Sequence, residues 1–166
     1  MAATTTLKPI ALGYRPTVDS GSTQGEYTRL MGVLKGLSIS QDEPDSTTID
    51  AEFYDSPFDI FYQGKPVTMT FELANYELSE LEPIFGGDAT STEYEGATTA
   101  HTSEFEWKLD FGRGYASLVI YKGLTIGTLK KDADGALNFA VTITSSIVTT
   151  GTGSSATDHM YKIVAS

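Results

Sequence analysis

The stretch Val67-Thr-Met-Thr-Phe-Glu-Leu73 alternates apolar and polar side chains without a break. Successive side chains of a β-strand point to opposite faces, so this pattern places the apolar residues on one face and the polar ones on the other. Residues 104–111 repeat the alternation, with apolar side chains at every second position. The two segments predict a β-sheet with one buried face and one polar face. The residues expected in its core are Val67, Met69, Phe71, Leu73, Phe105, Trp107, Leu109, Phe139 and Val141.

Further strands are expected on both sides of these segments. Strands at 124–129 and 136–148 are joined by Asp132-Ala-Asp-Gly135, a sequence typical of a β-hairpin turn. Residues 161–165 can form a closing edge strand. We therefore predict a mainly β fold. It is a single-domain antiparallel β-sandwich or barrel of about eight strands, with one short flanking α-helix and a long extended arm and loops.

The helix is expected at residues 79–85. Ser79 and Glu82 have the spacing of a capping box, and Pro83 falls in the first turn, where no intrahelical donor is lost. Gly86-Gly87 is a typical helix end. A helix of about two turns is not stable alone, so it must pack on the sheet. The side chains expected at that contact are Leu78, Leu81, Ile84 and Phe85.

Two segments lack sustained periodicity. Residues 1–28 contain Pro9, Pro16 and a Ser- and Gly-rich run, and we expect an extended N-terminal arm that is not part of the core. Residues 29–166 then form the β-sandwich or barrel domain. Residues 86–102 consist almost wholly of Gly, Ser, Thr, Ala and acidic residues. This composition predicts a long structureless loop.

Charge and composition exclude several classes of function. The 166 residues include 22 acidic and 11 basic side chains, a net charge of −11, which argues against a DNA- or RNA-binding surface. The absence of cysteine excludes disulfides, thiolate zinc sites and a cysteine nucleophile. No run approaches the roughly 20 apolar residues of a membrane span. The N-terminal residues do not have the features of a secretory signal, so a bacterial or viral cytoplasmic product is expected.

Searches for catalytic and metal-binding patterns give no strong candidate. His101 and His159 are the two histidines, and their spacing fits no metal motif. Asp132-Ala-Asp-Gly135 resembles part of a calcium loop, but an EF-hand register would place Lys130 and Val141 at ligand positions. We expect no cofactor and no metal.

A pair of carboxylates for glycoside hydrolysis is the most serious enzymatic alternative. Glu104 and Glu106 share a strand face, and Asp110 or Glu72 could lie opposite. The same residues are explained by a polar outer face, and no cluster of sugar-binding side chains accompanies them. We therefore expect no enzyme activity.

Three segments together resemble phage tail tube (major tail) proteins. Residues 46–58 read STTIDAEFYDSPF, residues 64–75 read GKPVTMTFELAN, and residues 78–87 read LSELEPIFGG. They give a strand with an acidic-Ser-Pro turn, then a Val-x-Met-x-Phe-x-Leu strand, then a short helix that ends in Phe-Gly-Gly. The resemblance covers roughly residues 30–146.

This resemblance implies a structural virion protein of the tail, assembled in the host bacterial cytoplasm. Its subunits would form hexameric rings that stack into a tube, with partners in further copies of itself and in other tail proteins. DNA would pass through without specific binding, and no membrane would be involved. The arm and the 86–102 loop would become ordered mainly through neighbouring subunits. The candidate lumen-facing acids are Glu104, Glu106 and Asp110.

Other readings stay open. A tail terminator, a connector or a capsid decoration protein is also rich in β-strands, and a carbohydrate-binding or adhesin module is a further alternative. The apolar segment 124–129 could form an edge that a neighbouring subunit extends by main-chain pairing.

Overall fold

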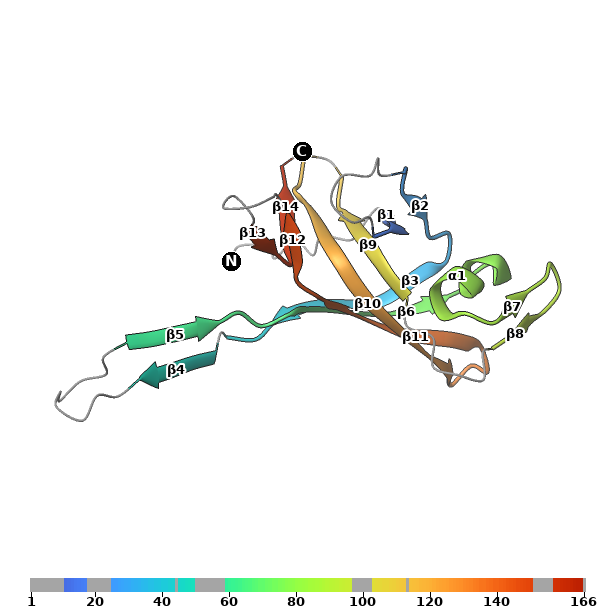
Figure 1. The fold of residues 1–166 in the computed structure, drawn as a ribbon. Helices are drawn as coiled ribbons and strands as arrows, with labels where there is room; N and C mark the ends of the chain where they lie inside the picture. Colours follow the sequence, from blue (N-terminus) through green and yellow to red (C-terminus); the bar gives the residue numbers. More distant parts are fainter. Residues whose placement is uncertain are drawn as a thin grey trace, which may run out of the picture.

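A computed structural model of the chain describes residues 11–17, 25–43, 45–49, 59–96, 103–112, 114–150 and 157–165. The fold is mainly β, as expected, and its largest element is an eight-stranded antiparallel sheet (Figure 1). The strand order is β2 (Thr28–Arg29), β1 (Ala11–Pro16), β9 (Ser103–Asp110), β10 (Ser117–Lys131), β11 (Leu137–Ser145), β6 (Val67–Ala74) and β3 (Val33–Gln41). The eighth strand, β14 (Tyr161–Val164), pairs with β10.

Three pairs of shorter strands accompany the sheet. They are β4 (Asp45–Ile49) with β5 (Asp59–Gln63), β7 (Asp88–Ala89) with β8 (Tyr94–Glu95), and β12 (Val148–Thr150) with β13 (Thr157–His159). Within the described ranges, no helix is long and apolar enough to cross a membrane.

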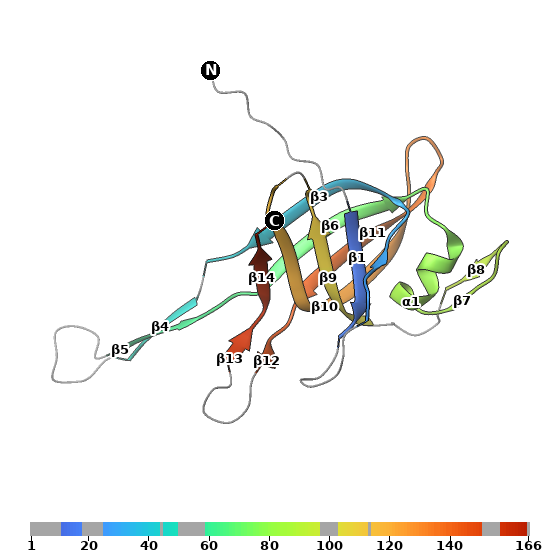
Figure 2. The same cartoon turned by 90° about the horizontal axis from the view of Figure 1, so that it is seen from above.

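Strand β10 joins the two halves of the sheet. Its first part pairs with β9 and β14, and its second part pairs with β11; the β9 register is irregular between Ile120 and Gly123. Figure 2 shows β3, β6 and β11 running across the direction of β1, β9 and β14. The inner faces of both halves therefore contribute to one apolar cluster, in which Leu12 and Trp107 meet side chains of β6 and β11.

The predicted core is confirmed. Eight of its nine residues are buried, and the ninth, Phe105, is half-buried and packs against the cluster. The one polar atom of the Trp107 ring is satisfied inside the core, because its Nε1 donates a hydrogen bond to Thr125 Oγ1 at 3.1 Å. Strict alternation predicts the core residues correctly because one face of the sheet is covered by the rest of the fold.

The expectation of an arm outside the core is wrong for Ala11–Pro16. These residues form β1, which pairs with β9 along its whole length, and its Leu12 and Tyr14 are only 1% and 7% exposed. Leu12 and Tyr14, with one residue between them, are too short a pattern to predict a strand, and the prolines around them indicate a loop. Residues 1–10 and 18–24 lie outside the described residues.

The expectation of a structureless loop at 86–102 is wrong for its first part. Strands β7 and β8 form a small hairpin beside the helix (Figure 1). Tyr94 donates a hydrogen bond from its hydroxyl to the Gly86 carbonyl oxygen at 2.8 Å, and its ring lies edge-on to Phe139. Residues 97–102 lie outside the described part of the chain.

The predicted helix exists, but it begins differently. A 3₁₀ turn, Leu78–Glu80, leads into α1 (Leu81–Phe85), which buries Leu81 and Ile84 as expected. The predicted Ser79 cap is wrong, because Ser79 lies inside the 3₁₀ turn and the capping box is formed by Glu77 and Glu80. Instead the backbone N–H of Glu77 donates to Glu80 Oε2 at 3.1 Å. The extra 3₁₀ turn moves the helix start, and with it the capping pair, by two residues.

The turn Asp132–Gly135 joins β10 to β11 as predicted, with Gly135 at a φ of 86°. The expectation of an edge strand at 124–129 holds only in part. Leu124 and Thr125 pair with both β9 and β11, whereas from Ile126 onward β11 is the one partner strand among the described residues.

Candidate self-assembly surfaces

The three acids predicted to face a lumen lie on one face of β9 but in different environments. Glu104 is exposed and forms an ion pair with Lys122 at 2.9 Å. Asp110 is half-buried and accepts a hydrogen bond from the Gly112 backbone N–H at 2.8 Å. Glu106 is only 2% exposed. A carboxylate so deeply covered does not line a lumen in this conformation of the subunit, so the expectation for Glu106 is wrong.

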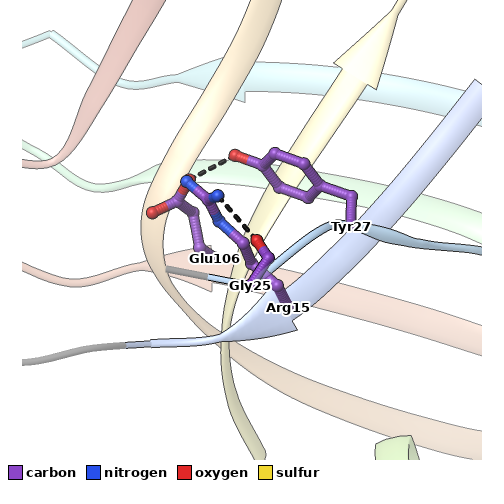
Figure 3. Close-up of polar contacts among 4 residues, drawn as sticks. All are labelled: Arg15, Gly25, Tyr27 and Glu106. Carbon is purple, nitrogen blue, oxygen red and sulfur yellow. Dashed lines mark hydrogen bonds and ion pairs between the residues drawn. The ribbon is translucent and has the colours of Figure 1, made fainter. Parts of the chain in front are cut away.

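Glu106 is covered by two side chains from the N-terminal part of the chain (Figure 3). Arg15 donates to Glu106 Oε1 from Nε at 3.1 Å and from Nη2 at 2.5 Å, and the Tyr27 hydroxyl donates to the same oxygen. Arg15 also binds the Gly25 carbonyl oxygen at 3.0 Å, and its guanidinium carbon lies 4.2 Å from the centre of the Tyr27 ring. The cluster therefore ties the segment around Tyr27 to the outer face of the sheet.

Gly13 allows this segment to approach β1 closely. A Cβ at residue 13 would lie 3.1 Å from Tyr27 Cβ, and residue 13 sits between Arg29 on β2 and Lys108 on β9 in the sheet register. Sequence reasoning missed Arg15 and Tyr27 because it placed both in an arm away from the core. The alternation of β9 predicts which residues share a face, but it does not tell what covers that face.

The side chains of this cluster bind one another and stabilise the fold. Burial, and then the hydrogen bond to Glu106, raise the pKa of Tyr27 well above its ordinary value. The phenol of Tyr27 therefore stays protonated and donates to the carboxylate of Glu106. The same carboxylate forms an ion pair with Arg15. Among the described residues, no group of three or more histidine or acidic side chains is placed to hold a metal ion. His159 is exposed beside the Tyr121 ring, and His101 lies outside the described residues.

A groove with apolar walls lies between β14 and the end of β3. It has a volume of about 320 Å³. Tyr161 bridges it with a weak hydrogen bond from its hydroxyl to Gln41 Oε1 at 3.4 Å. On the rim, Ile163 is 68% exposed. The apolar side chains of the lining are Ile39, Val67, Phe111, Leu118, Tyr161 and Ile163.

Both walls of this groove are sheet edges. In the described part of the chain, β14 pairs only with β10, and β3 pairs only with β6. An edge strand presents unpaired backbone N–H and C=O groups, and an apolar edge is a template for pairing with another chain. Sequence reasoning identified the edge strand at 161–165, but only the fold shows that β3 lies opposite.

The paired strands β4 and β5 form a ribbon that continues β3 and β6 away from the body of the protein (Figure 1). Residues 42–63, which include the ribbon, carry seven acidic residues and no lysine or arginine. A two-stranded ribbon alone is only marginally stable in water. The acids are Asp42, Glu43, Asp45, Asp50, Glu52, Asp55 and Asp59.

Comparison with protein-family models and with curated proteins finds no match to this chain. A functional assignment therefore depends on the outer face of β9, the groove between β3 and β14, and the β4–β5 ribbon.

Proposed function

We propose that this chain is a structural subunit of a phage tail tube, which assembles into stacked hexameric rings and conducts DNA. The observation that carries the proposal is the apolar groove between the β3 and β14 edges. The sequence resemblance supplies the kind of assembly and its sixfold symmetry. The groove supplies a physical reason for self-assembly.

An exposed apolar edge favours association with another chain. Ile163 lies on the rim of the groove, and Tyr161 on the same strand lines the groove and is also partly exposed. If a strand of a second copy occupies the groove, it pairs with an open edge and covers these side chains. Copies that pair edge to edge form open-ended aggregates unless the symmetry of the assembly closes it. A ring is a closed assembly of this kind.

The charge of the chain suits a channel for a polyanion. With a net charge of −11, an assembly of such subunits repels DNA weakly instead of binding it. Glu104 and Asp110 remain candidates for the lumen wall. Their carboxylates are at least partly accessible, in contrast to that of Glu106.

The test combines solution mass, negative-stain microscopy and one pair of variants. The wild-type protein should form rings or tubes as its concentration rises, and it should not bind duplex DNA at low salt. Ile163→Asp places a charge on the rim of the groove and should keep the protein small. Ile147→Asp is the matched control, because Ile147 is 55% exposed but does not line the groove.

Two results would overturn the proposal. One is a wild-type protein that stays monomeric at high micromolar concentration and binds duplex DNA. The other is an Ile163→Asp variant that assembles as well as the Ile147→Asp control. Discrete closed oligomers that never stack would instead favour another virion component, such as a tail terminator or a connector.

A further inference from the structure

We propose that the tip of the β10–β11 hairpin, residues 129–137, of one copy enters the groove between β3 and β14 of a second copy. This inference rests on the proposed function, because it names the part of the chain that occupies the groove. Two leucines of the hairpin tip contact the apolar walls of the groove. A lysine of the tip meets acidic side chains at the end of β3.

The hairpin tip carries two apolar side chains that the core of its own chain does not cover. Leu129 pairs with Phe139 across the hairpin, and Leu137 lies two residues before Phe139 on β11, so both leucines share one face of the sheet. Phe139 is buried and stacks on the Phe85 ring, which closes the core on this face. Leu129 and Leu137 remain 58% and 55% exposed. Neighbouring exposed apolar side chains indicate an interaction site.

The hairpin tip is held in one shape by its turn. The Gly135 backbone N–H donates to the Asp132 carbonyl oxygen at 2.9 Å, and the Asp132 N–H donates to that of Ala136 at 2.8 Å. The Asn138 side-chain amide also donates to the Asp132 carboxylate at 2.6 Å. A segment that is already ordered in the free subunit loses little conformational entropy when it docks.

The groove offers walls of matching chemistry. It has a volume of about 320 Å³ and is lined by apolar side chains from β3, β6, β10 and β14. Ile39 on one wall and Ile163 on the opposite rim are exposed in the free subunit. When the hairpin tip fills the groove, the apolar surfaces of the groove and of the tip leave water together, which favours the contact.

The charges beside the two apolar surfaces are opposite in sign. Lys131 is exposed and shares the sheet face of the two leucines. Asp42 and Glu43 are exposed and directly follow Gln41, which lines the groove. Within the described ranges, none of these three charged side chains forms an ion pair. Charge complementarity of this kind favours one orientation of the docked hairpin.

The hairpin tip and the groove of one chain are too far apart to meet. Val67, the first residue of β6, lines the groove, whereas Leu73 near the other end of β6 pairs with Phe139. Six residues of a strand span about 20 Å, and the tip lies further on in the same direction. Figure 2 shows the hairpin ending on the side of α1, away from β14. The contact is therefore heterologous, and such a contact produces rings or open stacks.

Removal of the two leucines tests the apolar part of the contact. Leu129→Ser/Leu137→Ser should raise the concentration for half-assembly at least about tenfold, measured by sedimentation velocity, because both side chains lose their burial in the groove. The matched control is Ile126→Ser/Ile147→Ser. Both isoleucines are more than half exposed, like the leucines, but lie outside the tip and the groove. The control should assemble like the wild-type protein, and circular dichroism checks that both variants are folded.

An exchange of charges tests the polar part. Lys131→Glu and Glu43→Lys should each raise the concentration for half-assembly about threefold, the effect of one exposed ion pair. The two substitutions combined in one chain should restore assembly, because the tip and the groove then again carry opposite charges. The combined variant keeps the net charge of −11, so a change in overall charge does not explain the recovery.

Cross-linking detects the contact directly, because the chain contains no cysteine. A mixture of Leu137→Cys and Ile163→Cys should give covalent dimers with a short thiol-specific cross-linker. A mixture of Leu137→Cys and Ile147→Cys is the control and should give few dimers, because Ile147 does not line the groove.

The outcomes separate this inference from the proposed function. Wild-type protein that stays monomeric contradicts both. Small oligomers that cross-link between positions 137 and 163 but never form rings or tubes support the contact and contradict the proposed function. Rings that do not cross-link between these positions, with a double serine variant that assembles as well as its control, overturn the contact alone. If Ile163→Asp prevents assembly and the serine variant does not, the groove binds another segment of the second copy, which also overturns the inference.

Discussion

The ring of Phe85 lies flat on the ring of Phe139, with centroids 4.9 Å apart and planes inclined by 11°. This contact joins the end of α1 to the start of β11. Gly127 on the neighbouring strand β10 makes room for it, because a Cβ at residue 127 would lie 2.1 Å from Phe85 Cε1. A glycine inside a strand is usually unfavourable, and here it marks the place where the helix approaches the sheet.

The variant Gly127→Ala should therefore lower the free energy of unfolding by about 1–3 kcal/mol, the range for overpacking a close contact. In a Phe85→Leu background the added methyl group meets a smaller side chain, so its effect should be clearly smaller. Urea denaturation of the four proteins in this cycle measures the coupling. Gly25→Ala is the control, since no atom lies within 4 Å of a Cβ at residue 25. Equal losses in both backgrounds would show that Phe85 is not the cause.

The alternation in β6 makes a second prediction. Phe71 is buried in the apolar cluster, whereas Thr70 beside it lies on the outer face opposite Thr142. Phe71→Ala should lower the free energy of unfolding by about 3–5 kcal/mol, the usual loss for a truncated core aromatic. Thr70→Ala should change it by less than about 1 kcal/mol. Similar losses for the two variants would mean that the face assignment of β6 is mistaken.

The core could be predicted because burial of one face imposes a period of two on the sequence. The same period of two does not predict which polar side chains of β9 are buried. Its residues 104, 106, 108 and 110 share a face, yet Glu106 is buried and Glu104 is exposed. The difference comes from Arg15 and Tyr27, about 80–90 positions earlier in the chain. No local pattern contains that information.

The assembly surfaces were predictable to a different degree. The acidic run at 42–63 is visible in the sequence, but only the strand pairing shows that β4 and β5 within it form a ribbon beyond the sheet. The groove is not visible in the sequence at all, because its walls, β3 and β14, come from distant segments of the chain.

The helix start provides a third prediction. Glu80 Oε2 accepts the Glu77 backbone N–H at 3.1 Å, and the other carboxylate oxygen accepts the Met31 backbone N–H. Glu80→Ala leaves both donors without this partner, so it should lower the free energy of unfolding by about 1 kcal/mol. Ser79→Ala should have an effect within about 0.5 kcal/mol, because Ser79 is exposed. If thermal or urea unfolding ranks the two variants in the opposite order, Ser79 and not Glu80 caps the helix.

The buried cluster around Glu106 makes the last prediction, which concerns alkaline pH. Burial and the hydrogen bond to Glu106 raise the pKa of Tyr27 well above its ordinary value of 10.0. The folded protein therefore keeps this proton at a pH at which the unfolded chain has released it. A group with a raised pKa contributes stability that is complete below about pH 10 and is lost as the pH rises further. The wild-type protein should lose stability steadily above that pH.

Tyr27→Phe removes the titrating proton, so its free energy of unfolding should fall less steeply than that of the wild-type protein between about pH 9 and about pH 11. Part of the decline should remain, because burial also raises the pKa of Tyr14 and of Tyr94. At neutral pH the variant should be less stable, since the buried Glu106 loses one of its hydrogen-bond donors. Tyr115→Phe, at an exposed tyrosine, is the control and should keep the wild-type slope. Urea denaturation across this pH range measures the free energy of unfolding at each pH. If it falls equally steeply with pH for Tyr27→Phe and wild type, the pKa of Tyr27 is not raised in the folded protein.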